Sequence, residues 1–138
     1  AQSSVMQTVV GGGSAAAIDD DNLNQNYEVF SSMRLSELQA EGKPVFVNMT
    51  AAWCITCLAN EQTSLGTDRV QQAMSDNDIT YMKGDWTNED PEITAVLEEF
   101  KRPAVPLYVL YSGDPSKEPI ILPQLLTPGI LAEAFESI

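Results

Sequence analysis

The chain has 138 residues, of which 20 are acidic and 7 are basic, so its formal net charge is −13. This length suits one domain with a single hydrophobic core. The charge argues against binding to nucleic acid or to an anionic membrane surface, because phosphate groups are bound by clustered Lys and Arg. The absence of histidine excludes Ser-His and Cys-His catalytic pairs and histidine-based metal sites. No segment reaches the roughly 18 apolar residues that a membrane-spanning helix needs, so we expect a soluble domain.

Residues 1–26 combine Gly, Ser, Ala, Asp and Asn without a sustained hydrophobic period. Such a segment buries too little apolar surface to offset its conformational entropy. We therefore predict a flexible linker to a preceding domain or a remnant of cloning, and we assign the folded domain to residues 27–138. Its first elements are a short edge strand over 27–30 and a short helix over 36–41 that ends at Gly42.

The middle of the domain alternates strands and helices. Apolar runs predict buried strands over residues 45–49 and 79–86, and a helix over 54–65 follows the first of them. Thr67 can cap a further helix, and Asp90 can cap another, with a proline at its first position. Helical spacing predicts that these helices bury the following side chains: Val70, Ala73, Met74, Ile93, Val96, Leu97 and Phe100.

The last third of the chain predicts a hairpin and a terminal helix. Strands are expected over residues 107–111 and 119–122, with a turn at 113–115 between them. A helix opens at Thr127 and Pro128, and it buries Ile130, Leu131, Ala134 and Phe135. The order β-α-β-α-β-α-β-β-α predicts an α/β fold, in which a central mixed β-sheet is flanked by helices on both faces.

The only two cysteines of the chain, Cys54 and Cys57, are separated by two residues. They follow a predicted strand and begin a predicted helix. The free N–H groups at a helix N-terminus favour the thiolate, which is the reactive form of cysteine. An exposed Cys54 can attack a disulfide of a partner, and Cys57, one turn further, can resolve the mixed disulfide. The motif therefore predicts redox chemistry.

Two other roles of the cysteine pair remain open. A structural disulfide would close so short a loop that it stabilises little on the chain-entropy account. A metal site would have to accept two sulfurs alone, as Cu(I) can, or recruit carboxylate ligands, as zinc would. The sequence implies no cofactor.

Four segments resemble a known family: TAAWCITC at 50–57, DWTNEDP at 85–91, VPLYVLY at 105–111 and LPQLLTP at 122–128. Through them the chain resembles the thioredoxin superfamily. More narrowly it is similar to the C-terminal periplasmic thioredoxin-like domain of DsbD-type thiol:disulfide interchange proteins, including the ScsB branch linked to copper tolerance. The resemblance implies a protein-disulfide reductase.

That resemblance also implies a cellular setting. In the family, the domain receives electrons from a membrane-embedded redox domain of the same polypeptide. It passes them to thioredoxin-like or other disulfide-bearing proteins of the periplasm. We therefore expect a periplasmic, monomeric domain tethered to an inner-membrane protein, and the copper-tolerance link leaves a Cu(I)-binding module as the alternative.

The resemblance assigns roles to three residues that surround the cysteines. Pro106 aligns with the cis-proline that faces the Cys-x-x-Cys motif in thioredoxin folds. It implies that the backbone of Val105 pairs with an extended segment of the partner. Trp53, directly before the first cysteine, is expected to pack over the site and shield it.

Two further positions concern proton transfer. Glu61, four residues after Cys57, matches an acidic position of the family, where a carboxylate raises the thiol pKa and can relay the proton of Cys57. The alternative is an exposed surface glutamate. Asn48 replaces an aspartate of many relatives and cannot titrate, so the relay must use Glu61 or water. Lys83 aligns with the lysine that partners that aspartate, and we expect it to be solvated or paired with Glu61.

Overall fold

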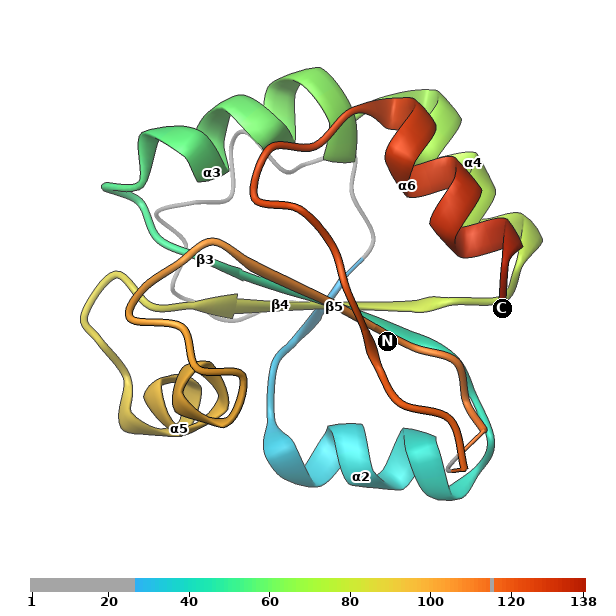
Figure 1. Cartoon of the computed structure of the whole chain (residues 1–138), viewed down its shortest axis with the longest axis horizontal. Coiled ribbons are helices and arrows are strands. Elements are labelled where there is room, and N and C mark those ends of the chain that lie inside the picture. The colour runs from blue at the N-terminus through green and yellow to red at the C-terminus, as the bar shows by residue number, and fades with distance from the viewer. Residues whose placement is uncertain (1–26, 115) are drawn as a thin grey trace, which may run out of the picture.

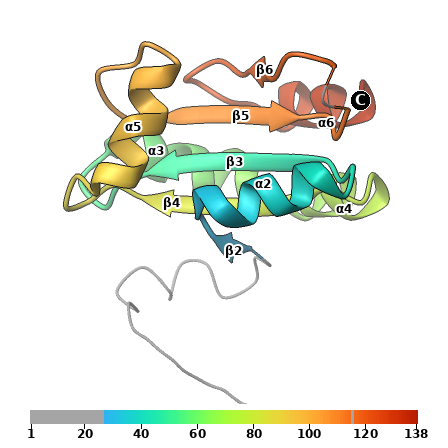
Figure 2. The ribbon, with the colours of Figure 1, turned by 90° about the horizontal axis from the view of Figure 1, so that it is seen from below.

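A computed structural model of the chain describes residues 27–114 and 116–138, and the predicted linker at 1–26 lies outside them. Five strands form one sheet in the order β2-β4-β3-β5-β6 (Figure 2). Strand β4 pairs in parallel with β2 and β3, whereas β5 is antiparallel to β3 and to β6. The strands are β2 (Glu28–Val29), β3 (Val45–Thr50), β4 (Thr80–Asp85), β5 (Leu107–Tyr111) and β6 (Ile120–Ile121).

Helices cover both faces of this sheet (Figure 1). One face carries α2 (Ser32–Ala40) and α5 (Pro91–Glu99). The other carries α3 (Ile55–Asn60), the π-helical turn η4 (Glu61–Leu65), α4 (Asp68–Asp76) and α6 (Pro128–Glu136). The predicted α/β class, a mixed sheet between two helical layers, is confirmed.

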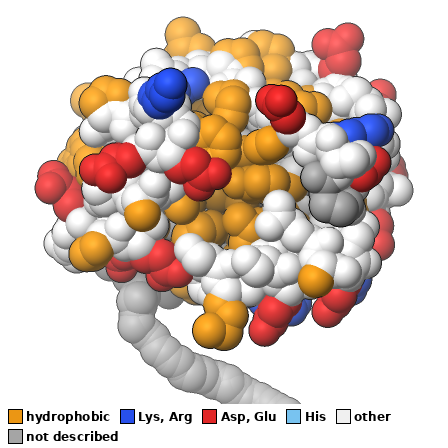
Figure 3. All heavy atoms as spheres, turned by 60° about the horizontal axis from the view of Figure 1, so that its bottom comes forward, with side chains coloured by type: hydrophobic (Ala, Val, Ile, Leu, Met, Phe, Trp, Pro, Cys, Tyr) orange, Lys and Arg blue, Asp and Glu red, His pale blue; other side chains and the backbone are white. Residues whose placement is uncertain are grey.

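The sheet separates two hydrophobic clusters, because successive side chains of a strand point to opposite faces. In β3, Phe46 belongs to the cluster under α4 and α6, whereas Val47 and Met49 belong to the cluster that also contains both cysteines. Figure 3 shows the face with α2 and α5, where apolar side chains gather in a hollow among charged and polar ones. The cysteine site therefore lies at the border of a packed core.

Most helix boundaries follow from capping residues. Thr67 caps α4 by accepting a hydrogen bond from the N–H of Val70, and Asp90 caps α5 in the same way, as predicted. Helix α2 was predicted over 36–41, which is wrong at its start. It begins at Ser32, because the hydroxyl of Ser31 accepts the N–H of Arg34 at 3.0 Å.

The terminal helix differs from its prediction only in the register of its buried side. The structure buries Leu131 and Phe135 as predicted, and it buries Ala132 in addition, while Ile130 and Ala134 are half-buried. The helical run after the cysteines ends at Leu65 as predicted, but its second half has π-helical hydrogen bonding. That change of helix type begins at Glu61, one of the predicted site residues.

Candidate active site

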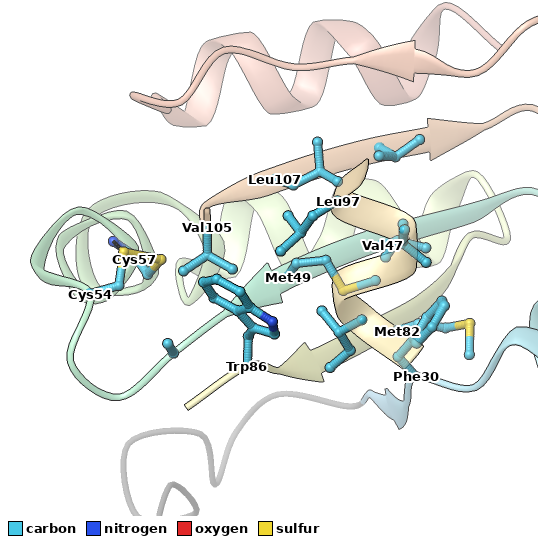
Figure 4. Close-up of a cluster of buried hydrophobic side chains, with 14 of the residues drawn as sticks. Phe30, Val47, Met49, Cys54, Cys57, Met82, Trp86, Leu97, Val105 and Leu107 are labelled. Carbon is cyan, nitrogen blue, oxygen red and sulfur yellow. Dashed lines mark hydrogen bonds between the residues drawn. A yellow bond between two sulfur atoms is a disulfide. The ribbon is translucent and has the colours of Figure 1, made fainter. Parts of the chain in front are cut away.

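The two cysteines form a disulfide at the beginning of helix α3, with their Cα atoms 5.3 Å apart. Cys54 is the N-cap residue, and its Sγ accepts a hydrogen bond from the backbone N–H of Cys57 at 3.2 Å. Figure 4 shows the pair at one end of the buried cluster, where the α3 ribbon starts. The sulfur atoms therefore lie at the positive end of a helical run, the place that favours a thiolate.

The two cysteine residues differ in their exposure to solvent. Cys54 is 7% exposed and Cys57 is 0% exposed. The prediction of an exposed Cys54 is wrong for this oxidised state, because the residue caps the helix and packs into the cluster that contains Trp86 and Val105. Cys54 is thus the more exposed of the two cysteines.

Three apolar side chains close in sequence to the cysteines are exposed to solvent. Trp53 is 51% exposed and Ile55 is 81% exposed, and Leu58, one turn further along α3, also faces solvent. The ring of Trp53 lies 5.9 Å from the ring of Trp86, and its Nε1 donates to the carbonyl of Thr87 at 3.1 Å.

The peptide bond between Val105 and Pro106 is cis, and both residues are buried. They directly precede β5, whose first residue, Leu107, is paired with Met49 of β3. The segment that leads from β3 to Cys54 starts at this same end of the sheet. The antiparallel pairing thus brings Pro106, which is 52 positions away in sequence, to the cysteine end of the sheet.

Glu61 and Lys83 form a buried ion pair beside the active-site helix. The Nζ of Lys83 lies 3.0 Å from Oε1 of Glu61, and their side chains are 1% and 13% exposed. The backbone N–H of Glu61 donates to the carbonyl of Cys57, so this carboxylate lies one helical turn after the second cysteine. The alternative of an exposed surface glutamate is wrong. Lys83 was expected to be solvated or paired with Glu61, and the structure has it paired with Glu61.

Asn48 lies next to this pair, in register with Lys83 on the neighbouring strand. Its Nδ2 donates to the hydroxyl of Tyr81 at 3.0 Å. Its Oδ1 is buried and has no hydrogen-bond partner among the described residues. The neutral amide therefore bonds a phenol and leaves the lysine to the carboxylate of Glu61.

Burial and the charge of Glu61 shift the pKa values of Lys83 and Tyr81. Loss of hydration lowers the pKa of Lys83, while the charge and hydrogen bond of Glu61 partly restore it. Burial raises the pKa of Tyr81, and the nearby negative charge of Glu61 raises it further. A carboxylate that is compensated by an ammonium repels a thiolate less than a lone carboxylate does.

Thr87 connects the loop after β4 with the loop before the cysteines, and the sequence did not identify it as a site residue. Its Oγ1 accepts the backbone N–H of Ala52 at 2.8 Å. Its own N–H donates to Oδ1 of Asp85 at 2.9 Å, and its hydroxyl bonds the same oxygen. The hydroxyl thus fixes the residue two positions before Cys54.

Asn60, the last residue of α3, makes a second connection that sequence reasoning missed. Its Nδ2 donates to the hydroxyl of Tyr108 and to the carbonyl of Gln124, both at 2.8 Å, and its Oδ1 accepts the N–H of Leu126 at 3.1 Å. These bonds attach the active-site helix to β5 and to the loop before α6. Since the partners lie 48 to 66 positions away, no local pattern could have indicated them.

The described part of the chain offers neither a cluster of metal ligands nor a membrane-spanning helix. Residues 27–114 and 116–138 contain no group of three or more His, Cys, Asp or Glu side chains that could hold a metal ion. Within the same residues, no helix has the length and apolar character needed to cross a membrane.

Comparison with known proteins gives matches to thiol:disulfide interchange proteins. Thiol:disulfide interchange protein DsbD of Escherichia coli (strain K12) is 26% identical over 82 residues, which are 59% of this chain and 14% of that protein. The same protein of Shigella flexneri serotype 5b gives the same values. The chain thus spans a small part of the length of the curated relatives that it matches.

Solved structures show the same fold. The oxidised DsbD C-terminal domain of Neisseria meningitidis has a TM-score of 0.61 and 22% identity, covering 81% of this chain and 98% of that one. A thioredoxin from Thermus thermophilus has a TM-score of 0.65 and 15% identity, covering 80% and 85%. Residues 25–113, more than half of the chain, match the model of the family described as Thioredoxin-like. The predicted resemblance to the DsbD-type domains is therefore confirmed, and the chain belongs to the thioredoxin-like family.

Proposed function

We propose that the domain is a thiol:disulfide oxidoreductase that reduces disulfides of other proteins through Cys54 and Cys57. The observation that carries this proposal is the disulfide at the start of α3, in which Cys54 is the more accessible sulfur and caps the helix. The name of the DsbD relatives, thiol:disulfide interchange protein, supports the same chemistry.

The reaction starts from the reduced pair. The thiolate of Cys54 attacks one sulfur of the partner's disulfide, so that a mixed disulfide forms and the other partner sulfur leaves as a thiolate. Cys57 then loses its proton and attacks the Sγ of Cys54. This step forms the intramolecular disulfide and releases the second partner sulfur, so two electrons pass to the partner and the domain is left oxidised.

The residues around the pair supply what these two steps need. The N–H of Cys57 already donates to Sγ of Cys54, and the same contact stabilises a thiolate at that position. Glu61, one turn after Cys57, is the carboxylate that accepts the proton of the resolving thiol, with water as the alternative acceptor.

The partner segment is held beside the sulfurs by backbone and apolar contacts. Val105, next to the cis-proline, offers its backbone to an extended segment, as an added strand would. An exposed apolar surface beside the cysteines is formed by Trp53, Ile55 and Leu58. Asn48 shapes the site through its hydrogen bond to Tyr81, and its neutral amide cannot act as an acid or base.

The similarity to DsbD proteins also supports a proposed setting. In this setting, residues 27–138 form a monomeric domain of a longer inner-membrane protein. The domain works in the periplasm, and residues 1–26 tether it. A membrane-embedded redox domain of the same polypeptide reduces it, and periplasmic thioredoxin-like or other disulfide-bearing proteins oxidise it.

Reduction of insulin by a thiol reductant tests the proposed activity. We expect the chain to accelerate precipitation of the insulin B chain, and Cys54→Ser to abolish the acceleration. Ser75→Ala, an exposed change on α4, is the control that leaves the rate unchanged. Absence of acceleration by the wild-type chain would refute the proposal.

The direction of electron flow and the copper alternative need one further measurement each. Equilibration with glutathione gives the reduction potential of the pair, and a value below that of the glutathione couple supports a reductase. Stoichiometric Cu(I) binding that survives a competing thiol chelator, in a chain that shows no disulfide exchange, would instead support the Cu(I)-binding module.

A further inference from the structure

The buried ammonium of Lys83 is enclosed by an aromatic residue that belongs to neither the active-site helix nor the central strands. The ring centroid of Tyr27 lies 4.5 Å from Nζ of Lys83, on the N-terminal side of the edge strand β2. The ring of Tyr81 lies 5.8 Å from the same atom, and the two rings meet edge to face at 6.2 Å. The ammonium is thus held between one carboxylate and two aromatic rings.

We propose that Tyr27 is a positioning residue of the redox site, whose ring holds the Lys83 ammonium against Glu61 and so sets the charge near the cysteine pair. The inference rests on the proposed thiol:disulfide chemistry and goes beyond it, because it extends the site to the strand that opens the described chain. Tyr27 touches neither sulfur and acts only through Lys83 and Glu61.

The packing explains why this ring is needed. Strand β2 is parallel to β4, and Val29 is paired with Lys83. Tyr27 lies two residues before Val29, and its ring contacts the end of the lysine side chain. A cation on an aromatic face is held more strongly where water is excluded, and Lys83 is 1% exposed. Removing the ring takes away this attraction and part of the cover over Nζ, so the ammonium is held less firmly against the carboxylate.

The charge at this position reaches the thiols along the helix. Glu61 lies seven residues after Cys54, which corresponds to about 10 Å of helix rise. Among the described residues, Asp85 at the end of β4 also acts on Lys83 through its charge. The phenols that surround the pair belong to three strands or their ends: Tyr27, Tyr81 and Tyr108.

The direction of the effect follows from these charges. When Lys83 moves away, the negative charge of Glu61 is less compensated, and the thiolate of Cys54 becomes less favourable. We therefore expect Tyr27→Leu to raise the pKa of the Cys54 thiol by about half a unit, a roughly threefold loss of thiolate at pH values well below that pKa. Tyr27→Phe keeps the ring face and is expected to shift it by less than half as much.

The test measures the pH dependence of Cys54 alkylation by iodoacetamide in the full chain after reduction. It is done for wild type, Tyr27→Leu and Tyr27→Phe, and again for each in the Lys83→Met background. Because the proposed effect passes through Lys83, Tyr27→Leu is expected to add no shift in that background. A purely structural role of the ring would leave the alkylation profile unchanged.

Three outcomes would overturn the inference: no shift in a folded Tyr27→Leu chain, an equal shift in Tyr27→Phe, or a shift that persists without Lys83. If Tyr27→Leu does not unfold cooperatively in urea, Tyr27→Met takes its place with the same expectations. An unchanged alkylation profile in a chain that still reduces insulin refutes the inference alone. A wild-type chain that does not reduce insulin refutes the proposed function instead.

Discussion

The ion pair between Glu61 and Lys83 is expected to be strongly coupled in stability, because both side chains are almost removed from water. Glu61→Gln leaves the ammonium, which is 1% exposed, without a countercharge, and we expect it to lower the free energy of unfolding by about 3 kcal/mol. Lys83→Met leaves a carboxylate that water still reaches, since it is 13% exposed, so about 2 kcal/mol is expected. The double variant removes both charges and should cost about 2 kcal/mol, giving a coupling energy of about 3 kcal/mol.

Urea unfolding of the oxidised chain, followed by tryptophan fluorescence, measures all four corners of this cycle. Urea is preferred to guanidinium because it is uncharged and does not screen ion pairs. The control is the exposed pair of Arg34 and Glu28, which has a similar N···O distance of 2.9 Å and side chains 39% and 42% exposed. Removing Arg34 should change stability much less. A coupling energy for the buried pair no larger than that of the exposed pair would refute the reasoning.

Three other changes test the surroundings of the site. Asn60→Ala removes three hydrogen bonds and leaves their partners unpaired, so the free energy of unfolding should fall by about 3 kcal/mol. The control Asn88→Ala, at an exposed position, should change it by less than about 0.5 kcal/mol. Equal effects of the two variants would contradict the assigned network. Thr87→Val keeps the shape of the side chain but removes the acceptor of the Ala52 N–H, so insulin reduction should slow. The control Thr63→Val, at an exposed position, should leave the rate unchanged. An unchanged rate for Thr87→Val would show that the loop is fixed by other contacts. Because burial lowers the pKa of Lys83, the unfolded chain binds more protons than the folded one between that lowered pKa and the ordinary 10.5. Urea unfolding of wild type relative to Lys83→Met should therefore show a stability difference that rises with pH up to about 10.5, and a difference that falls would mean the opposite shift.

Elements with local signals were predicted well from the sequence. The caps Thr67 and Asp90 mark helix starts because their side chains bond N–H groups two or three residues away. The apolar runs of β3 and β5 mark buried strands because both faces of the sheet are covered. The start of α2 was missed because this helix buries only Leu38, so no apolar stripe announces its first turn.

The site residues that belong to a sequence motif were predicted. Those whose role comes from contacts across the sheet were not. The spacing of Cys54 and Cys57 and the position of Pro106 are visible in the sequence. The roles of Asn60 and Thr87 arise from hydrogen bonds between segments more than 30 positions apart, which only the packed sheet brings together. Polar residues in loops and at helix ends are too common to be singled out without that knowledge.

The exposure of Cys54 was misjudged for a related reason. A helix N-terminus in the sequence gives the direction of the first turn but not what packs against it. Here Trp86 and Val105, from the segments after β4 and before β5, belong to the same buried cluster as the two cysteines. This packing across the sheet leaves Cys54 only 7% exposed.

The central claim is that Cys54 attacks and Cys57 resolves, and the reaction of the two single-cysteine variants with a small aromatic disulfide tests it most directly. Cys57→Ser keeps the accessible sulfur and should form a mixed disulfide at least about tenfold faster than Cys54→Ser, whose remaining thiol is fully buried. Both variants must unfold cooperatively for the comparison to hold. A faster reaction of Cys54→Ser, or equal rates for the two variants, would contradict the account.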